Sequence, residues 1–507
     1  MHSGWCGAGV PLRQAVPVAV VPAPSPDPAR GTTPGRLERA APVALGLVVA
    51  CLAGFRAGPL SDYDGWWHLR TGEYILDRSV IPRRDPFSWT ALGDRWHPNG
   101  WAADPVFEAV RRVGGLAGVS VLRAGLFAVT LLAIGALARR RGARPWPIVA
   151  AVVVAGLALI PFVNERPQLF SYLLLPVAVA LAGPALSGSN RALAGLAATF
   201  VLWANLHGVA PLGVAVVGAM AAGHAVASRR AGRPVVVVAV AALAVLATPY
   251  GVLTYTDAPV VRGLGRDLAI GEYRHPDLAQ GADLMATIVA VLAVVSLIRT
   301  GRWRRLDVVL PLALLAVATV DAIRSAPMFV VLAGPELALG FATIGSARLR
   351  ARTGPRAGPL AAGGAVVLAA ALVGAVDTAG KAGHVDRSRF PAGAVAAIPD
   401  GCRVLNEYEQ GGYLLFARWP GVKVSQDSRA DVYGTAPLLE QRRFLQGGSG
   451  AEKWLRENGV DCVLAEPDRP LLDQLRATPD WREVVAEPAG VLLVRRHRSA
   501  GTAVDHP

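Results

Sequence analysis

Apolar residues along this chain fall in long blocks that alternate with shorter polar segments. A helix that crosses a bilayer needs about 20 predominantly apolar residues. Blocks near this size recur between residues 41 and 377, so the pattern predicts a polytopic α-helical membrane protein with about 11 transmembrane helices. The expected spans are 41–57, 117–138, 147–163, 169–186, 192–206, 210–227, 234–252, 284–298, 306–320, 327–345 and 359–377.

Arginine clusters occupy alternate loops between these blocks, at 139–144, 229–233, 299–305 and 348–356. Because short cytoplasmic loops carry an excess of Lys and Arg, the clusters predict the cytoplasmic side of the membrane. Two long polar loops, 58–115 and 253–283, then lie on the outer face of what we expect to be a bacterial plasma membrane. Residues 1–40 are rich in Pro and Ala and predict a disordered cytoplasmic tail.

The pattern changes after the last apolar block. Short strand-like and helix-like segments alternate there, which predicts a small extracytoplasmic α/β domain at 378–507. Strands are expected at 403–405, 422–424, 461–465 and 491–494, and helices at 438–445, 451–458 and 470–477. Cys402 and Cys462 both lie in this domain, where they either pair or remain small buried thiols.

Composition supports the membrane interpretation. Charged residues make up 17% of the chain, against about 25% in a soluble protein, and the mean hydropathy is +0.39. The formal net charge of +14 raises the question of nucleic acid. The positive residues lie in short loops between apolar blocks, however, so we expect no nucleic-acid partner.

The polar segment 61–108, directly after the first predicted span, is the first candidate for chemistry. It begins with Asp62 and Asp64, which are either solvated loop acids or catalytic groups. Nucleotide-activated substrates are cytoplasmic, so an outer-face reaction needs a substrate activated on a membrane lipid, such as a lipid-phosphate-linked sugar. Its transfer requires a general base for the acceptor hydroxyl, and cations or a metal for the departing phosphate. Asp62 and Asp64 fit the base, or the ligands of a divalent cation.

The residues that follow predict a helix at the membrane interface. Trp66 and Trp67 suit that depth, either as anchors or in contact with substrate. His68 lies four residues after Asp64, on the same helical face, and either contacts substrate or is solvated. Asp104 precedes Pro105 and an apolar helical pattern, which favours a helix cap. Glu108 follows four residues later as a possible second acid of the site.

Further polar residues occur at the outer ends of later spans. They are Glu165, Arg166, His207, Glu272, Arg274 and Arg324, all candidates for substrate binding. Arg166, Arg274 and Arg324 together suit a phosphate cradle, because Arg binds phosphate in a bidentate manner. The alternatives are a salt bridge between Arg166 and Glu165, and a packing role for His207. Segment 426–431 either binds sugar, caps the membrane site or forms a salt-bridged turn.

Five sequence runs carry a resemblance to a known superfamily: DYDGWWHLRTGEYIL, IPRRDPFSWTALGDRW, NERPQLFSYLL, WANLHG and GGYLLFARWPGVKVSQDSRADVYG. With its Asp-x-Asp pair, about ten spans and an external C-terminal domain, the chain resembles the GT-C membrane glycosyltransferases, which include protein O-mannosyltransferases and aminoarabinose transferases. The resemblance implies a polyprenyl-phosphate sugar donor, an inverting transfer and a first-loop Asp as base, here Asp62 or Asp64. The protein mannosyltransferases carry Asp-Glu at that position, and this chain does not.

The leading hypothesis is a glycosyltransferase that moves a sugar from a polyprenyl-phosphate donor to a cell-envelope acceptor at the outer face. One alternative is a transporter or flippase of a lipid-linked saccharide. A transporter is expected to contain paired broken helices, and the sequence shows no such pattern. Another is a membrane protein whose C-terminal domain binds the envelope. The expected partners are therefore the lipid-linked sugar, membrane lipid and the envelope acceptor.

Overall fold

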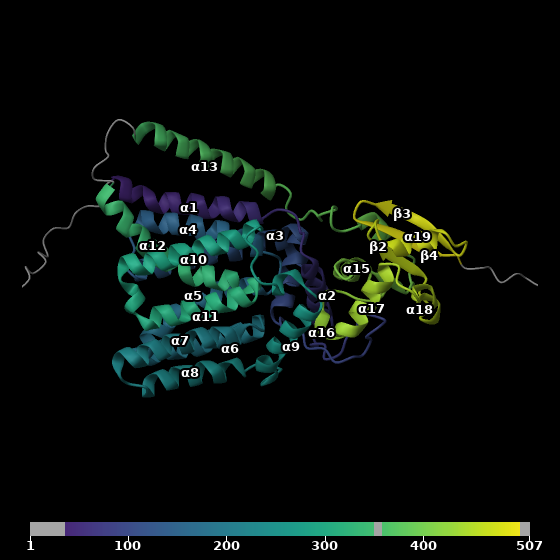
Figure 1. Ribbon diagram of the computed structural model, residues 1–507, viewed down its shortest axis with the longest axis horizontal. Helices are drawn as coiled ribbons and strands as arrows, with labels where there is room; N and C mark the ends of the chain where they lie inside the picture. The colour runs from purple at the N-terminus through teal and green to yellow at the C-terminus, as the bar shows by residue number, and fades with distance from the viewer. Residues whose placement is uncertain (1–35, 349–356, 497–507) are drawn as a thin grey trace, which may run out of the picture.

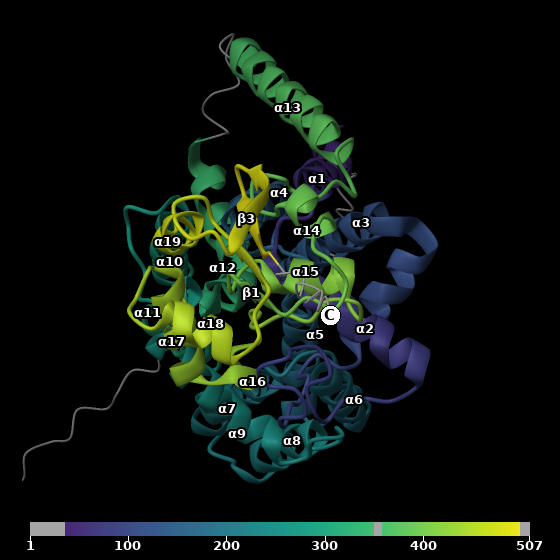
Figure 2. The ribbon, with the colours of Figure 1, turned by 90° about the vertical axis from the view of Figure 1, so that its right-hand side faces the viewer.

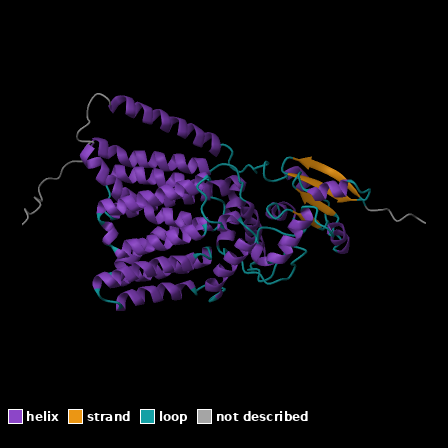
Figure 3. Cartoon of the chain, viewed as in Figure 1, coloured by secondary structure: helices purple, strands orange, loops and turns teal. Residues whose placement is uncertain are grey.

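The computed structural model describes residues 36–348 and 357–496. Most of the predicted cytoplasmic tail, the Arg-rich segment 349–356 and residues 497–507 lie outside the described residues. Figure 1 shows a bundle of long helices lying side by side, with a smaller C-terminal part at one end of it. The strands are confined to that smaller part (Figure 3).

Eleven helices within the described residues coincide with the eleven predicted spans. They are α1 (Arg36–Arg56), α3 (Ala103–Arg140), α4 (Pro145–Leu159), α5 (Gln168–Leu186), α6 (Asn190–Leu206), α7 (Ala210–Ser228), α8 (Gly232–Val245), α10 (Gly281–Thr300), α11 (Leu306–Asp321), α12 (Ala326–Arg348) and α13 (Ala357–Ala379). Two more helices, α2 (Tyr63–Arg78) and α9 (Leu253–Asp267), lie at the end of the bundle that meets the C-terminal part (Figure 1). Short 3₁₀ turns, η1 (Ile160–Phe162), η2 (Gly271–Tyr273), η3 (Arg302–Arg304) and η4 (Ile323–Ser325), complete the connections.

Seven stretches of the described chain are long and apolar enough to cross a bilayer. They are Glu38–Arg56, Ala103–Arg140, Pro145–Phe162, Gln168–Leu186, Ala210–Ser228, Gly281–Thr300 and Ile323–Thr343. The chain is therefore a multi-pass membrane protein. The other predicted spans are helical, but α6, α8 and α11 have only 17, 14 and 16 residues, so helix length does not establish a count of eleven crossings.

Helix α3 is interrupted where the predicted second span begins. Gly115 has φ of 62° and ψ of −162°, outside helical geometry, within a helix that otherwise runs from Ala103 to Arg140. A positive φ is tolerated by glycine because it has no Cβ. The break separates a first segment, which packs against α2, from the apolar remainder that crosses the membrane.

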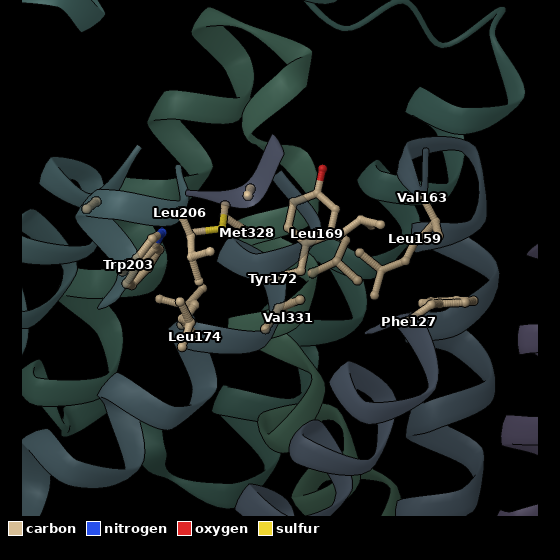
Figure 4. Packing of buried hydrophobic residues seen from close by; sticks show 14 of the residues in the cluster. Phe127, Leu159, Val163, Leu169, Tyr172, Leu174, Trp203, Leu206, Met328 and Val331 are labelled. Carbon is tan, nitrogen blue, oxygen red and sulfur yellow. The ribbon is translucent and has the colours of Figure 1, made fainter. Parts of the chain in front are cut away.

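Large apolar side chains fill the centre of the bundle. Phe127, Leu159, Leu169, Trp203 and Val331 come from five different helices, and each is at most 2% exposed. Figure 4 shows several of these side chains meeting between the helices. Lipid is as apolar as such side chains, so close van der Waals packing supplies the association between helices.

The C-terminal part contains a four-stranded mixed sheet in the order β1-β2-β4-β3. Its strands are β1 (Val404–Asn406), β2 (Cys462–Ala465), β3 (Trp481–Glu487) and β4 (Gly490–Arg495). Strands β1 and β2 are parallel, and the other pairs are antiparallel. Its helices are α14 (Ala392–Ala396), α15 (Gly411–Arg418), α16 (Ala430–Tyr433), α17 (Thr435–Leu445), α18 (Ala451–Glu457) and α19 (Pro470–Arg476).

The structure decides whether the two cysteines of this part pair, and it corrects one predicted strand. Cys402 and Cys462 form a disulfide, with their Cα atoms 6.2 Å apart. The predicted strand at 422–424 is wrong, because Lys423 and Val424 each make only an isolated bridge. Val424 pairs with Ser88, which belongs to the polar segment before α3.

The polar segment after α1 and the C-terminal part share one core. Trp66 packs edge-on against Phe390 and Tyr413, with ring centroids 5.4 and 5.0 Å apart, and α15 lies against α2 (Figure 2). The predicted helix is confirmed, but the interpretation of its tryptophans as membrane anchors is wrong. Trp66 is 1% and Trp67 8% exposed, because the C-terminal part covers them.

Candidate active site

A cavity of about 340 Å³ lies where the bundle meets the C-terminal part. It is bounded by the start of α2, the loop before α5, η2 and the segment that precedes and begins α16. Of the candidates from the sequence, Asp64, His68, Arg166, His207, Glu272 and Arg324 line it. The structure thus brings together residues that lie more than 250 positions apart in the sequence.

Asp62 caps α2 and holds Arg166. Its Oδ1 accepts hydrogen bonds from the backbone N–H of Asp64 at 2.8 Å and of Gly65 at 3.3 Å. The same oxygen accepts from Arg166 Nε at 2.6 Å. Burial alone would raise the pKa of Asp62, but the Arg166 guanidinium and these backbone donors outweigh burial and hold the pKa below its usual value. These contacts favour the ionised form of Asp62.

Asp64 has different surroundings. Its side chain is 20% exposed and lines the cavity, and its Oδ2 lies 2.9 Å from Arg166 Nη1. Burial raises the pKa of Asp64; Arg166 opposes the increase, and the neighbouring Asp62 carboxylate adds to it. A carboxylate with a raised pKa is the better proton acceptor of the two.

Arg166 is the central cation of the site. Besides Asp62 and Asp64, its Nη1 lies 3.3 Å from Glu272 Oε2. The alternative of a salt bridge between Arg166 and Glu165 is wrong. Glu165 instead pairs with Arg123 at 2.5 Å and accepts the backbone N–H of Asp62 at 3.0 Å, so it anchors the chain below the cavity without lining it.

Arg324 and His207 also line the cavity. Arg324 lies 3.4 Å from Glu272 and stacks over Tyr273, with its guanidinium carbon 4.3 Å from the ring centroid. His207 Nδ1 lies 2.7 Å from Ser171 Oγ. Burial, with Arg324 nearby, lowers the pKa of His207 to about 3, so this imidazole is neutral at ordinary pH.

His68 and Asp104 form a buried pair that the sequence did not predict. His68 Nδ1 lies 2.7 Å from Asp104 Oδ1, and the two residues are 5% and 0% exposed. The interpretations of Asp104 as a helix cap and of His68 as a solvated residue are therefore wrong. Ala102 occupies the N-cap position of α3, and Asp104 points from within the helix to α2. The second oxygen of Asp104, Oδ2, has no hydrogen-bond partner within the described residues.

Glu108 and Arg274, like Asp62 and Glu165, do not line the cavity. The Glu108 carboxylate is held by Arg111 at 2.6 and 2.7 Å and by Arg112 at 2.9 Å. Arg274 binds Asp283 at 2.5 Å and the carbonyl oxygen of His275 at 2.9 Å. The structure therefore places Arg166 and Arg324 at the cavity, but not Arg274.

The C-terminal part supplies residues that the sequence analysis missed. Tyr408 and Glu409 line the cavity, directly after strand β1. The signal available was the polar run 407–409 at the end of a predicted strand. Segment 426–431 forms a salt bridge and also borders the cavity, while sugar binding by this segment stays a prediction. Asp427 and Arg429 form a buried salt bridge at 2.6 Å, and residues 428–431 line the cavity.

A second cavity of about 370 Å³ adjoins the first. The two share His207, Tyr273 and Arg324, and the second continues between the ends of α6, α7, α11 and α12. Its walls include the apolar side chains of Leu212 and Met328. A polar site therefore opens directly into an apolar groove at the end of the bundle.

The two carboxylates that the sequence offered as metal ligands already pair with an arginine of the chain. Among residues 36–348 and 357–496, no group of three or more His, Cys, Asp or Glu side chains is arranged to hold a metal ion. Asp62 and Asp64 both pair with Arg166. We therefore derive no step through a divalent cation.

Solved structures share this fold. The chain superposes on the oligosaccharyltransferase AglB from Archaeoglobus fulgidus, in complex with an inhibitory peptide and a dolichol-phosphate, with a TM-score of 0.54 at 13% identity over 85% of this chain and 69% of AglB. The apo form of the Archaeoglobus fulgidus oligosaccharyltransferase gives a TM-score of 0.56 at 11% identity over 84% and 69%. The chain shares the fold of these oligosaccharyltransferases. The resemblance stated from the sequence is confirmed at that level.

ArnT from Cupriavidus metallidurans, bound to undecaprenyl phosphate, gives a TM-score of 0.48 at 14% identity over 91% of this chain and 98% of ArnT. No protein-family model and no curated protein matches the sequence. The likenesses to the two Archaeoglobus fulgidus structures show the fold, and the function has to be argued from the site.

Proposed function

We propose that the protein is a membrane glycosyltransferase that moves a sugar from a polyprenyl-phosphate donor to a hydroxyl group of a cell-envelope acceptor. The observation that carries the proposal is the cavity at the end of the bundle, where Asp64 lies beside Arg166 and Arg324 next to an apolar groove. This arrangement offers one proton acceptor, cations for a phosphate and an apolar surface for a lipid chain. The dolichol-phosphate bound by AglB, which shares the fold, supports the donor class.

In the proposed reaction the acceptor oxygen attacks the anomeric carbon and its proton passes to Asp64. The bond between the anomeric carbon and the phosphate oxygen breaks, and its electron pair leaves on the polyprenyl phosphate. Configuration at the anomeric carbon is inverted. Arg166 and Arg324 stabilise the charge that develops on the departing phosphate. Asp62 positions Arg166 and caps α2, so we assign it no direct part in the proton transfer.

We further propose that all eleven apolar helices cross the membrane, with the N-terminus in the cytoplasm and the site on the outer face. The Arg-rich loops then lie inside, as the positive-inside rule requires. The disulfide between Cys402 and Cys462 supports an oxidising surrounding for the C-terminal part.

The test is Asp64→Asn in protein purified in detergent and supplied with a sugar-labelled undecaprenyl-phosphate donor. Because a general base contributes about 10²–10⁴-fold, we expect transfer to fall at least 100-fold. Asp77→Asn is the matched control, since Asp77 lies on the same helix with its side chain 54% exposed. Transfer at the wild-type rate by Asp64→Asn would overturn the assignment of the base. Wild-type protein that consumes no donor in detergent would favour a transporter.

A further inference from the structure

A third cavity, of about 200 Å³, lies within the C-terminal part beside the candidate active site. Tyr408 and Glu409 line both this cavity and the cavity of the candidate active site, which is called the central cavity below. The apolar groove shares Arg324 and His207 with the central cavity. Arg442 of α17 closes its edge by donating a hydrogen bond to the carbonyl oxygen of Leu268, just after α9, at 3.1 Å. The groove and this third cavity thus each share lining residues with the central cavity.

More acidic than basic side chains line this third cavity. Three carboxylates line it, those of Glu407, Glu409 and Glu466, against the guanidinium groups of Arg442 and Arg469. Arg469 is already engaged, since its Nε lies 2.6 Å from Glu407 and its Nη2 2.5 Å from Glu466. The lining therefore carries a net charge of −1 (two positive and three negative groups). An anionic ligand meets repulsion there, and a group that donates hydrogen bonds does not.

Gln426 provides an independent sign of a ligand. The residue lines this cavity and is only 1% exposed. Its side-chain Nε2 donates to the carbonyl oxygen of Asn406 at 2.7 Å. Its Oε1 has no hydrogen-bond partner within the described chain. Buried acceptors are nearly always paired with a protein group or a water, so this oxygen can accept a donor from a molecule that enters the cavity.

Apolar side chains form the rest of the wall. Leu268, Leu438 and Leu445 line the same cavity and are each at most 3% exposed. A ligand that fits must therefore present hydroxyl or amino donors on one side and C–H groups on another. A pyranose ring has both kinds of surface.

We propose that the third cavity binds a neutral or amino sugar of the acceptor glycan and discriminates against acidic sugars. The proposal rests on the proposed function, because it names the class of acceptor that would reach Asp64 through the opening at Tyr408 and Glu409. A sugar hydroxyl or amino group donates to Gln426 Oε1, and the carboxylates accept further donors from the ring.

Binding is measured by saturation-transfer NMR on the full chain in detergent, with methyl glucoside, methyl N-acetylglucosaminide, glucosamine and methyl glucuronide as probes. We expect binding of the first three and not of the glucuronide. Gln426→Met removes the unpaired acceptor, and we expect binding about tenfold weaker. Glu440→Gln is the matched control, because Glu440 is exposed on α17 and does not line the cavity.

A second variant tests the proposal independently, in case Gln426→Met does not fold. The Glu466 side chain is 42% exposed, so Glu466→Lys changes the charge of the cavity with little effect on packing. We expect this variant to bind the glucuronide that wild type rejects. Equal binding of glucuronide and glucoside by wild type, or wild-type binding of glucoside by Gln426→Met, would overturn the proposal.

The outcomes separate this proposal from the proposed function. If wild type binds glycosides but never consumes the lipid-linked donor, the glycosyltransferase assignment fails and the sugar site stands. If donor is consumed and Gln426→Met still transfers to glycosides at the wild-type rate, the sugar site fails alone. If Gln426→Met hydrolyses donor with water but loses transfer to glycosides, both stand.

Discussion

Asp62 and Asp64 lie two residues apart, yet the structure gives them opposite electrostatic surroundings. Asp62 accepts two backbone N–H groups and Arg166 Nε, whereas Asp64 faces the cavity with one contact to Arg166. The pKa of Asp62 is lowered and that of Asp64 is raised. Neighbouring carboxylates whose pKa values move apart suit different tasks.

The variant Asp62→Asn should move the acid limb of the pH–rate profile to lower pH. Asn caps a helix as well as Asp does, so α2 should keep its start. Loss of the Asp62 charge removes one cause of the raised pKa of Asp64, and it leaves Arg166 to pair more closely with Asp64 and Glu272. Asp64 then remains ionised to lower pH. The measurement is kcat/KM for donor as a function of pH.

Asp77→Asn should leave the acid limb where it is, because Asp77 pairs with Arg112 away from the cavity. An acid limb that moves upward in Asp62→Asn would contradict the assigned electrostatics. An unmoved limb would show that a group other than Asp64 titrates there.

At the scale of residues, the structure brings Arg166 and Arg324 to one cavity, and their contact with phosphate stays a prediction. Arg274 does not line that cavity, because it meets Asp283 nine positions further along. The sequence around Asp104 fits the pattern of a helix N-cap, but in the structure the Asp104 carboxylate pairs with His68 of α2 instead. Such partners are set by tertiary packing, which no local pattern encodes.

Helix α2 lies unusually close to its neighbours, and glycines make this possible. A Cβ on Gly72 would lie 2.2 Å from the backbone oxygen of Asp104 in α3. A Cβ on Gly412 of α15 would lie 2.6 Å from the backbone oxygen of Tyr63. Glycine at these positions lets α2 pack directly between α3 and the C-terminal part.

Gly72→Ala should therefore destabilise the protein by about 1–3 kcal/mol, because backbone atoms must move to admit the methyl group. Gly125→Ala in α3 is the matched control. A Cβ there meets nothing within 4 Å, and Ala favours a helix more than Gly does. Thermal unfolding in detergent, followed by fluorescence, compares the two. An unchanged melting temperature for Gly72→Ala would contradict the close contact.

At the scale of elements, long apolar blocks were readable from the sequence, and all eleven expected spans are helical. Short elements of the C-terminal part were harder. Strand β3 was missed because three of its first five residues, Arg482, Glu483 and Val484, are exposed, as suits an edge strand, and only Trp481 in the strand is buried. The strand expected at 422–424 failed because Val424 pairs with the distant Ser88.

On the scale of the whole molecule, Arg429 joins the two parts. Its side chain is fully buried between Asp427 at 2.6 Å and Asp85 at 2.8 Å, and it lies 4.5 Å from the centroid of Trp96. Asp85 and Trp96 belong to the segment before α3, whereas Arg429 comes from the C-terminal part. A charge this deeply buried is tolerated only because it is paired.

Arg429→Met should cost about 3–5 kcal/mol, since it leaves two buried carboxylates without their cation. We expect a lower melting temperature, easier proteolysis after residue 384 and loss of transfer. Arg456→Met is the control, because Arg456 pairs with Glu452 on an exposed face of α18 and such pairs contribute little. Unfolding of Arg429→Met at the wild-type temperature would contradict a shared core.

The shared core also constrains how the protein is made. Trp66 and Asp85 leave the ribosome early, but Phe390, Tyr413 and Arg429 follow only after ten further apolar helices. During that interval the aromatic face of α2 has no cover and the cavity lacks one wall. A nascent or truncated chain therefore exposes an apolar surface to which chaperones and proteases can bind. The cavity has all of its walls only after the C-terminal part has docked on α2.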